Sequence, residues 1–375
     1  MSTIIIKDTL RQSVEAASGG AQTVLYTAKG QPSFVNIIPK ATIESIDPSL
    51  GTGTHPAFIV DGKEIPQLFI GTYQGVIKNG EFLSLPNAVP TSQNPDNYIY
   101  YNTAKACGAG WHAITAAEWG LLALQTFKAG TQPLGNTNWG FSSDAPTEFG
   151  RRVDGRQPGD KNNTTGITFT GSGPVDWRHD KTFSGISDLC GNIAEYNYGI
   201  RLMAGELQFL PDNNAALFAS DISPASAAWK ALDAITGAFI TPTFTGSIAG
   251  GDYVATTPTS VRVALTSANV PFSIQIPAFG ANLFTDFKNN SSQPISAAAL
   301  NKLKLLALFP LTINPADFKY DGFWATAITA QRALLSRGGH NVLGSAAGIF
   351  CGEWGRDGGG FISGWRPGFY ACLFF

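Results

Sequence analysis

Histidine and cysteine are the side chains in this chain that could bind a transition metal or act as nucleophiles. The four histidines form none of the HxH, HxxxH or HExxH spacings that place two ligands on one metal (His55, His112, His179 and His340). His179 precedes Asp180, but a polar loop histidine is the more common interpretation of such a pair. We therefore expect no bound metal and no other cofactor.

The four cysteines are scattered and form no CxxC pair (Cys107, Cys190, Cys351 and Cys372). A zinc site or a redox motif needs cysteines at close, regular spacing. An isolated free cysteine packs as a small hydrophobic side chain. We expect four buried thiols.

Two pairs of carboxylates have spacings that would suit acid–base catalysis, Asp188 with Glu195 and Glu353 with Asp357. Nothing beyond their spacing supports that role. The chain has no GxGxxG after a strand, no GxxxxGK[ST] and no GxSxG. Glycines 358–360 precede no Lys-Ser or Lys-Thr, so they indicate a turn. The residues alone favour a binding protein with no catalytic residues.

The composition excludes several classes of protein. Of the 375 residues 14% are charged, 42 are glycine, and the formal net charge is −2. An aromatic content of 11% argues against a disordered chain, and the lack of a basic balance argues against nucleic-acid binding. No run of eighteen apolar residues is present, so we expect no membrane insertion. What remains is a loop-rich globular protein.

The N-terminal sequence MSTIIIKDTLRQ has a short apolar run and then charges, which is not the pattern of a signal peptide. We expect the protein either to act inside the cell or to leave by another route, such as cell lysis or assembly on a virus particle.

Local patterns predict the elements that must position any site. A helix is expected over 9–17 and a strand over 23–26. From there to residue 86 the sequence pattern predicts short strands joined by turns. Asp61-Gly62 and Asn79-Gly80 are hairpin turn signals. A weak helix is expected over 101–107.

The clearest helix begins with Thr115-Ala-Ala-Glu118, a capping box, and ends at Gly130. Residues 130–185 have little periodicity and predict long irregular loops.

The amino-acid composition changes near residue 200. Residues 211–330 are rich in Ala, Ser, Thr and Pro. The pattern predicts helices over 223–236 and 296–308 and strands within 239–277. This part predicts either an insertion domain or elaborated loops. Between Arg337 and Gly368, eleven of 32 residues are glycine.

Three separated motifs resemble the formylglycine-generating enzyme branch of the C-type lectin fold. They are CGAGWHAITAAEWGLLAL (107–124), GISDLCGNIAEYN (185–197), and LLSRGGHN (334–341) followed by SGWRPGFY (363–370). The resemblance implies an α+β fold over 31–375 with an insertion at 200–330, preceded by a lead-in at 1–30.

Some motif residues have a structural role in this interpretation. Glu118 would cap the helix and Trp119 would pack in the core. Gly191-Asn192 would form a turn, and Glu195 would meet a buried polar partner. Arg337 and Arg366 would hold the C-terminal strands by donating hydrogen bonds to backbone carbonyls. Gly338 and Gly339, which follow Arg337, belong to the same fold motif. Phe350, Phe369 and Tyr370 are expected in the core.

The same branch contains copper enzymes, so an enzyme is the alternative. Its members use two nearby cysteines in the C-terminal segment, whereas the matching stretch here has only Cys351. This alternative is a divergent oxidoreductase of the formylglycine-generating type with a degenerate metal site.

The chain is more similar to the variable proteins of diversity-generating retroelements, which include phage tropism determinants. In these, an error-prone reverse transcriptase rewrites the C-terminal lectin segment, here 337–368. The resemblance implies a ligand on a host or cell surface, most naturally a protein. It also allows a homo-oligomer and a place on the virion surface. The residues expected to vary and to contact the ligand are His340, Asn341, Val342, Leu343, Ser345, Glu353, Trp354, Gly355, Arg356, Asp357, Phe361, Ser363 and Trp365.

Overall fold

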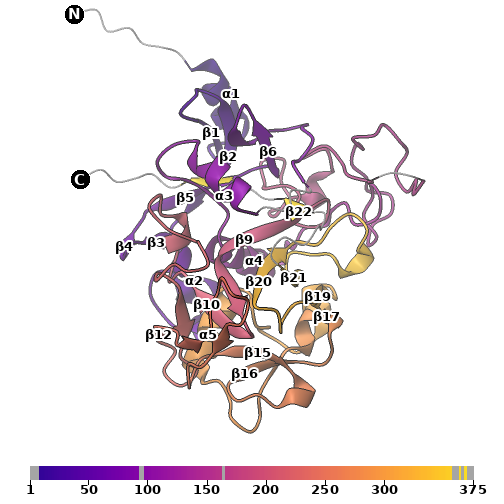
Figure 1. The fold of residues 1–375 in the computed structure, drawn as a ribbon. Coiled ribbons are helices and arrows are strands. Elements are labelled where there is room, and N and C mark those ends of the chain that lie inside the picture. The colour runs from indigo at the N-terminus through magenta and orange to yellow at the C-terminus, as the bar shows by residue number, and fades with distance from the viewer. Residues whose placement is uncertain (1–7, 93–96, 163–164, 357–362, 365–366, 370–375) are drawn as a thin grey trace, which may run out of the picture.

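The computed structural model describes residues 8–92, 97–162, 165–356, 363–364 and 367–369, and it mixes helices with sheets (Figure 1). The helices are α1 (Thr9–Ala17), α2 (Ile43–Ile46), α3 (Asn97–Lys105), α4 (Ala116–Ala129) and α5 (Ala297–Leu305). None of the helices in these ranges is long and apolar enough to span a bilayer. The expected α+β character is confirmed.

A five-stranded sheet joins the start of the chain to its end, in the order β1-β2-β5-β23-β8. Its strands are β1 (Gln22–Tyr26), β2 (Pro32–Pro39), β5 (Gln67–Gly71), β8 (Trp111–Ala113) and β23 (Pro367–Phe369). The backbone of Gly368 pairs with Ile70 on one side and His112 on the other. The last described strand is therefore held between two strands from the first third of the chain.

A larger sheet lies below it in Figure 1 and runs in the order β17-β19-β21-β20-β9-β10-β15-β16-β18. Its centre is β9 (Ala194–Met203), β20 (Arg332–Arg337) and β21 (Gly352–Arg356). The flanking strands are β10 (Glu206–Phe209), β15 (Arg262–Leu265), β16 (Ser273–Ile276), β17 (Gly280–Leu283), β18 (Lys288–Asn289) and β19 (Gly322–Ala325). Strands from 200–330 thus extend this sheet at both edges.

Shorter strand pairings complete the described sheets. β11 (Lys230–Leu232) joins β10 and β12 (Phe239–Ile240), and β22 (Ser363–Gly364) runs parallel to β9. Hairpins pair β3 (Ile59–Val60) with β4 (Lys63–Glu64), β6 (Gly75–Lys78) with β7 (Glu81–Ser84), and β13 (Phe244–Thr245) with β14 (Val254–Ala255). The first two turn at Asp61-Gly62 and Asn79-Gly80, all four with positive φ, as the sequence predicts.

The helix α4 begins and ends as its sequence predicts. The Thr115 hydroxyl accepts from the Glu118 amide, the Glu118 carboxylate accepts from the Thr115 amide, and Gly130 closes the helix with a φ of 66°. The helix packs against β9 and α5. Within the described part of 130–185, only a short 3-10 turn at Val175–Trp177 interrupts the irregular loops.

One expected helix is wrong. Residues 223–236 form turns and then β11, in which Ala231 pairs with Gln208 of β10. Pairing at the edge of a large sheet overrides the weak helical preference of an Ala-rich stretch. The helix expected over 296–308 is confirmed as α5. The helix expected over 101–107 is α3, which begins four residues earlier and ends two residues earlier.

Candidate ligand-binding face

The three motif segments meet in space beneath the C-terminal part of the chain. The Trp119 indole donates to the Ile349 carbonyl at 2.9 Å, and the Gly191 amide donates to the Gly338 carbonyl at 2.8 Å. A Cβ at Gly338 would lie 3.0 Å from the Leu189 carbonyl oxygen and 3.3 Å from the Trp119 ring, and φ is +85° there. Only glycine combines that conformation with so close an approach.

Asn192 is the polar centre of this framework. Its φ of 62° fits the turn predicted for it, and its side chain is fully buried. Its amide donates to Gln74 Oε1 at 2.9 Å, and its carbonyl oxygen accepts from the Thr168 amide at 2.8 Å and from Asn136 Nδ2 at 3.1 Å. Four segments are therefore tied together by one side chain.

The other framework residues behave as expected, with one difference. Glu118 is fully buried, and its Oε1 lies 2.7 Å from His112 Nε2; Glu195 accepts from Gln74 Nε2 at 3.3 Å. Arg337 donates to a backbone carbonyl, but the acceptor is Ala307, within 200–330, rather than a C-terminal strand. Arg366 lies outside the described residues.

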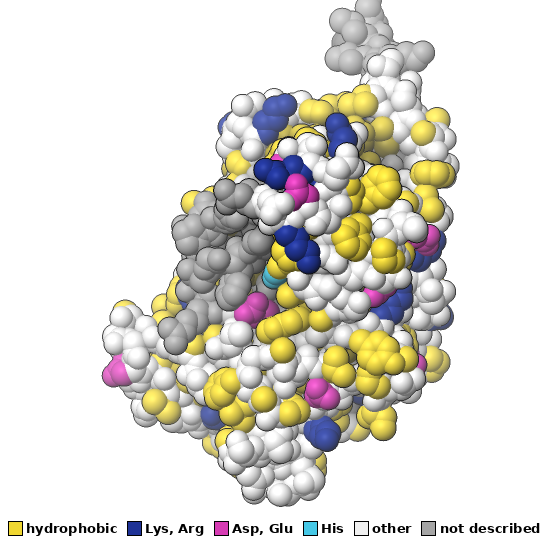
Figure 2. All heavy atoms as spheres, turned by 90° about the vertical axis from the view of Figure 1, so that its right-hand side faces the viewer, with side chains coloured by type: hydrophobic (Ala, Val, Ile, Leu, Met, Phe, Trp, Pro, Cys, Tyr) yellow, Lys and Arg dark blue, Asp and Glu magenta, His cyan; other side chains and the backbone are white. Residues whose placement is uncertain are grey.

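Above this framework, a pocket of about 190 Å³ opens beside β21. Trp324 of β19, Glu353 of β21 and Ser336 of β20 are direct neighbours across three paired strands, so their side chains share one face of the sheet. His340 and Leu343, from the loop after β20, line the pocket as well. On the face in Figure 2 a histidine lies close to an acidic side chain, with a Lys or Arg side chain directly above it.

The expectation that Trp354 contacts a ligand does not hold. Its side chain is only 2% exposed and belongs to the main hydrophobic core. Successive side chains of a strand point to opposite faces. Because Glu353 faces the pocket, Trp354 faces the core. Gly355, the next residue, is buried too.

Asn341 is also part of the framework and not of the surface. It is fully buried, its side-chain amide donates to the Thr165 carbonyl, and its backbone carbonyl accepts from the Trp139 amide at 2.8 Å. These bonds fasten the loop after β20 to the irregular loops of 130–166. The loop residues Val342 and Leu343 are half-buried, and Ser345 is exposed.

His340 and Glu353 give the pocket its polar character. Burial lowers the pKa of His340, which favours the neutral ring, and its Nδ1 has no hydrogen-bond partner among the described residues. Burial raises the pKa of Glu353, an effect that the hydrogen bond from the Thr326 hydroxyl at 2.8 Å opposes. The pocket thus places an imidazole ring and a carboxylate beside an indole ring.

The remaining candidate residues are described less completely. Ser363 is in β22, where its backbone pairs beside Ala194, which lines the pocket. Arg356 ends β21, and only its backbone is described. Asp357, Phe361 and Trp365 lie outside the described residues, as does Tyr370. Phe350 is buried, as expected, while for Phe369 only the backbone is described.

Sequence reasoning missed Trp324, Thr326, Ser336 and Ala194. Trp324 comes from the segment interpreted as an insertion, and no local motif marks it. Only the pairing of β19 with β21 brings it beside Glu353. The period-two pattern of β21 was the available signal for separating Glu353 from Trp354.

The cysteines are buried as thiols where they are described (Cys107, Cys190 and Cys351), while Cys372 lies outside that part of the chain. Cys351 lines the pocket, but burial raises the pKa of its thiol, which disfavours the thiolate that nucleophilic or copper chemistry requires. Within the described ranges, no three His, Cys, Asp or Glu side chains gather to hold a metal. His179 accepts from the Ile186 amide at 2.9 Å, as a loop histidine does.

Comparison with known proteins adds no family to this geometry. Neither a protein-family model nor a curated protein sequence matches the chain.

Proposed function

We propose that this protein is a non-enzymatic receptor-binding protein with a C-type lectin fold of the formylglycine-generating type, whose C-terminal surface is diversified by a retroelement. Its ligand would be a protein on a host or cell surface, and its place of action the surface of a virus particle. The observation that carries this proposal is the separation within 337–356 between a buried framework and a surface pocket.

The framework supports the lectin-type part of the proposal. Three motifs that are far apart in the sequence meet at Trp119, Gly191-Asn192 and Gly338 through hydrogen bonds and close packing. A loop fixed in this way can change its exposed side chains without losing its conformation.

The pocket beside β21 supports the proposed ligand binding. Trp324 supplies a rigid aromatic surface, and His340 and Glu353 supply polar groups at its edge. Aromatic side chains bring large contact area at low entropic cost, and such residues dominate binding energy at protein interfaces. The raised pKa of the Cys351 thiol weighs against the alternative of a copper oxidoreductase.

The test is to sequence the DNA that flanks the gene. The proposal expects a reverse-transcriptase gene and a near-copy of the segment encoding 337–368 that differs from it at adenines. The differences should fall on codons for surface positions such as His340, Leu343, Ser345 and Glu353, and should spare Gly338 and Gly339. Absence of the copy, or differences spread evenly over framework and surface codons, would overturn the proposal.

A further inference from the structure

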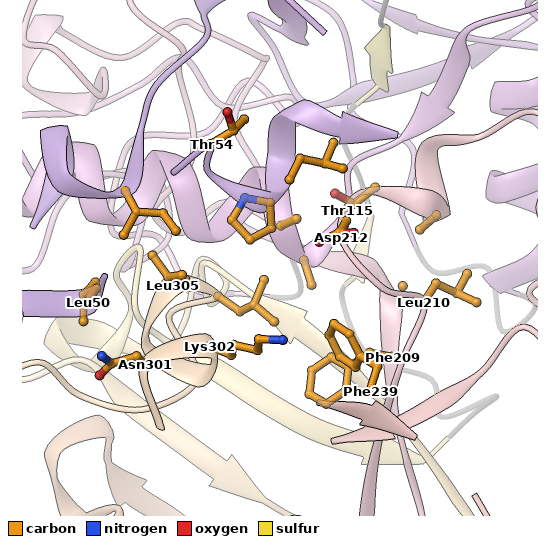
Figure 3. Close-up of a pocket in the computed structure, with 18 of the residues that line it drawn as sticks. Leu50, Thr54, Thr115, Phe209, Leu210, Asp212, Phe239, Asn301, Lys302 and Leu305 are labelled. Carbon is orange, nitrogen blue, oxygen red and sulfur yellow. The ribbon is translucent and has the colours of Figure 1, made fainter. Parts of the chain in front are cut away.

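A second pocket, of about 300 Å³, shares no residue with the pocket beside β21. It lies between the segment 43–59, the first turn of α4 and the helix α5, as the close-up in Figure 3 shows. Strand residues of β9, β10 and β12 complete its wall. The segment 200–330 thus supplies one side of a cavity whose other side comes from the start of the chain.

The walls of this pocket are mostly apolar, with two opposite charges among them. The apolar side includes Leu50, Phe209 and Leu305, and the charged groups are Asp212 and Lys302. In Figure 3 the Lys302 side chain extends from α5 into the cavity, on the side where Asp212 lies. A ligand cavity of this kind is apolar with a few polar groups that fix orientation.

Neither charged group has an ion-pair partner among the described residues. Within the part of the chain that the structure describes, no hydrogen bond and no ion pair within 4.0 Å involves the side chain of Asp212 or Lys302. The Lys302 ammonium lies 4.6 Å from the centroid of the Phe239 ring. Burial raises the pKa of Asp212, and the charge of Lys302 opposes this. By contrast, Lys40 and Glu64 form an ion pair at 3.0 Å on the surface.

The position of Asp212 is fixed by the hydrogen bonds of the next residue, Asn213. Asn213 is fully buried, and its amide donates to the Ala57 carbonyl at 2.9 Å and to Glu118 Oε1 at 3.0 Å. The Thr115 hydroxyl donates to Asn213 Oδ1 at 2.6 Å. With a φ of 55°, Asp212 then presents its carboxylate from a left-handed turn that aspartate tolerates better than most residues.

We propose that this pocket binds a small zwitterion with a large apolar side group, the chemical class of the aromatic and branched α-amino acids. The ammonium of the ligand pairs with Asp212, its carboxylate pairs with Lys302, and its side group covers the apolar wall at Leu50 and Leu305. Charge complementarity selects this class, because an apolar ligand without charges would leave both groups desolvated and unpaired. This inference does not depend on the function proposed for the surface beside β21.

Isothermal titration calorimetry on the full chain tests it, with L-phenylalanine as the probe. Two analogues each lack one charge: 3-phenylpropionate has no ammonium, and phenethylamine has no carboxylate. We expect both to bind at least tenfold more weakly than phenylalanine, because each leaves one charged group of the pocket unpaired.

Two variants assign the charges. Asp212→Asn, which suits the left-handed turn, should abolish the preference for phenylalanine over 3-phenylpropionate, and Lys302→Met should abolish the preference over phenethylamine. Lys304→Met, on the same helix but outside the pocket, is the matched control and should bind like the parent. Circular dichroism verifies that each variant folds. No heat of binding up to 10 mM phenylalanine, equal binding of a single-charge analogue by the parent chain, or unchanged preferences in both pocket variants would overturn the proposal.

Discussion

The strand β21 faces the pocket on one side and the hydrophobic core on the other, and the two sides differ in burial. On the pocket side, Glu353 is half-buried, and its carboxylate accepts a hydrogen bond from the Thr326 hydroxyl. On the framework side, Trp354 is enclosed by the hydrophobic core. The difference shows that exposure cannot be assigned to a segment as a whole, since alternate side chains along one strand point to opposite faces of the sheet.

Truncation on the core side should have the largest effect. We expect Trp354→Ala to lower the free energy of unfolding by about 3–5 kcal/mol, since it removes a buried aromatic side chain and leaves a cavity. Urea denaturation followed by fluorescence and circular dichroism measures this loss. A loss below about 1 kcal/mol would remove the distinction between the two faces of β21.

Asp321 is buried on the core side, and its ionisation should make the stability of the fold depend on pH. Its Oδ2 accepts from the Phe350 amide at 2.8 Å, and burial raises its pKa to about 7 from an ordinary value of 3.8. A carboxyl group with a raised pKa in the folded state stabilises the fold less as the pH rises from about 4 to 7. We therefore expect Asp321→Asn to gain stability relative to the parent over this range, by a few kcal/mol at about pH 8.

Urea denaturation at pH values from 4 to 8 measures that gain. The exposed Asp144→Asn is the control and should show no comparable pH-dependent difference. A constant difference between Asp321→Asn and the parent at all pH values would contradict the prediction.

On the pocket side, Glu353→Gln should change stability by less than about 1 kcal/mol, since this side chain is only half-buried. Because burial raises the pKa of Glu353, the variant should be slightly more stable than the parent at pH 7 and closer to it at pH 4. Thermal unfolding at the two pH values measures the difference. A large destabilisation at both would place Glu353 in the framework.

The exposed loop should tolerate change best of all. We expect Ser345→Arg to alter the free energy of unfolding by less than about 0.5 kcal/mol, because the side chain is exposed. The same denaturation measurement checks this. A cost above about 1.5 kcal/mol would show that the loop does not accept large side chains.

The predictable features were those encoded locally. The capping box at Thr115, the turns at Asp61-Gly62 and Asn79-Gly80, and the left-handed turn at Asn192 each depend on a few adjacent residues. The strand β11 could not be foreseen, because its pairing partner β10 lies over twenty residues away. The same holds for Trp324, which reaches the pocket only through long-range strand pairing. Sequence patterns thus indicated a segment that lines the pocket beside β21, but not which of its side chains face that pocket.

The polar centre at Asn192 has a consequence for the order in which the chain assembles. Its side-chain partners are Gln74, Asn136 and Thr168, which are 118, 56 and 24 residues away, and all three precede it. Contacts over such distances are slow to form. During synthesis, however, they can close long before the loop after β20 leaves the ribosome, since folding can begin from the N-terminal side. The loop after β20 then docks on this polar cluster, where the Asn192 carbonyl accepts from the Asn341 amide at 3.1 Å. The residues around Asn192 can therefore become ordered before the loop after β20 does.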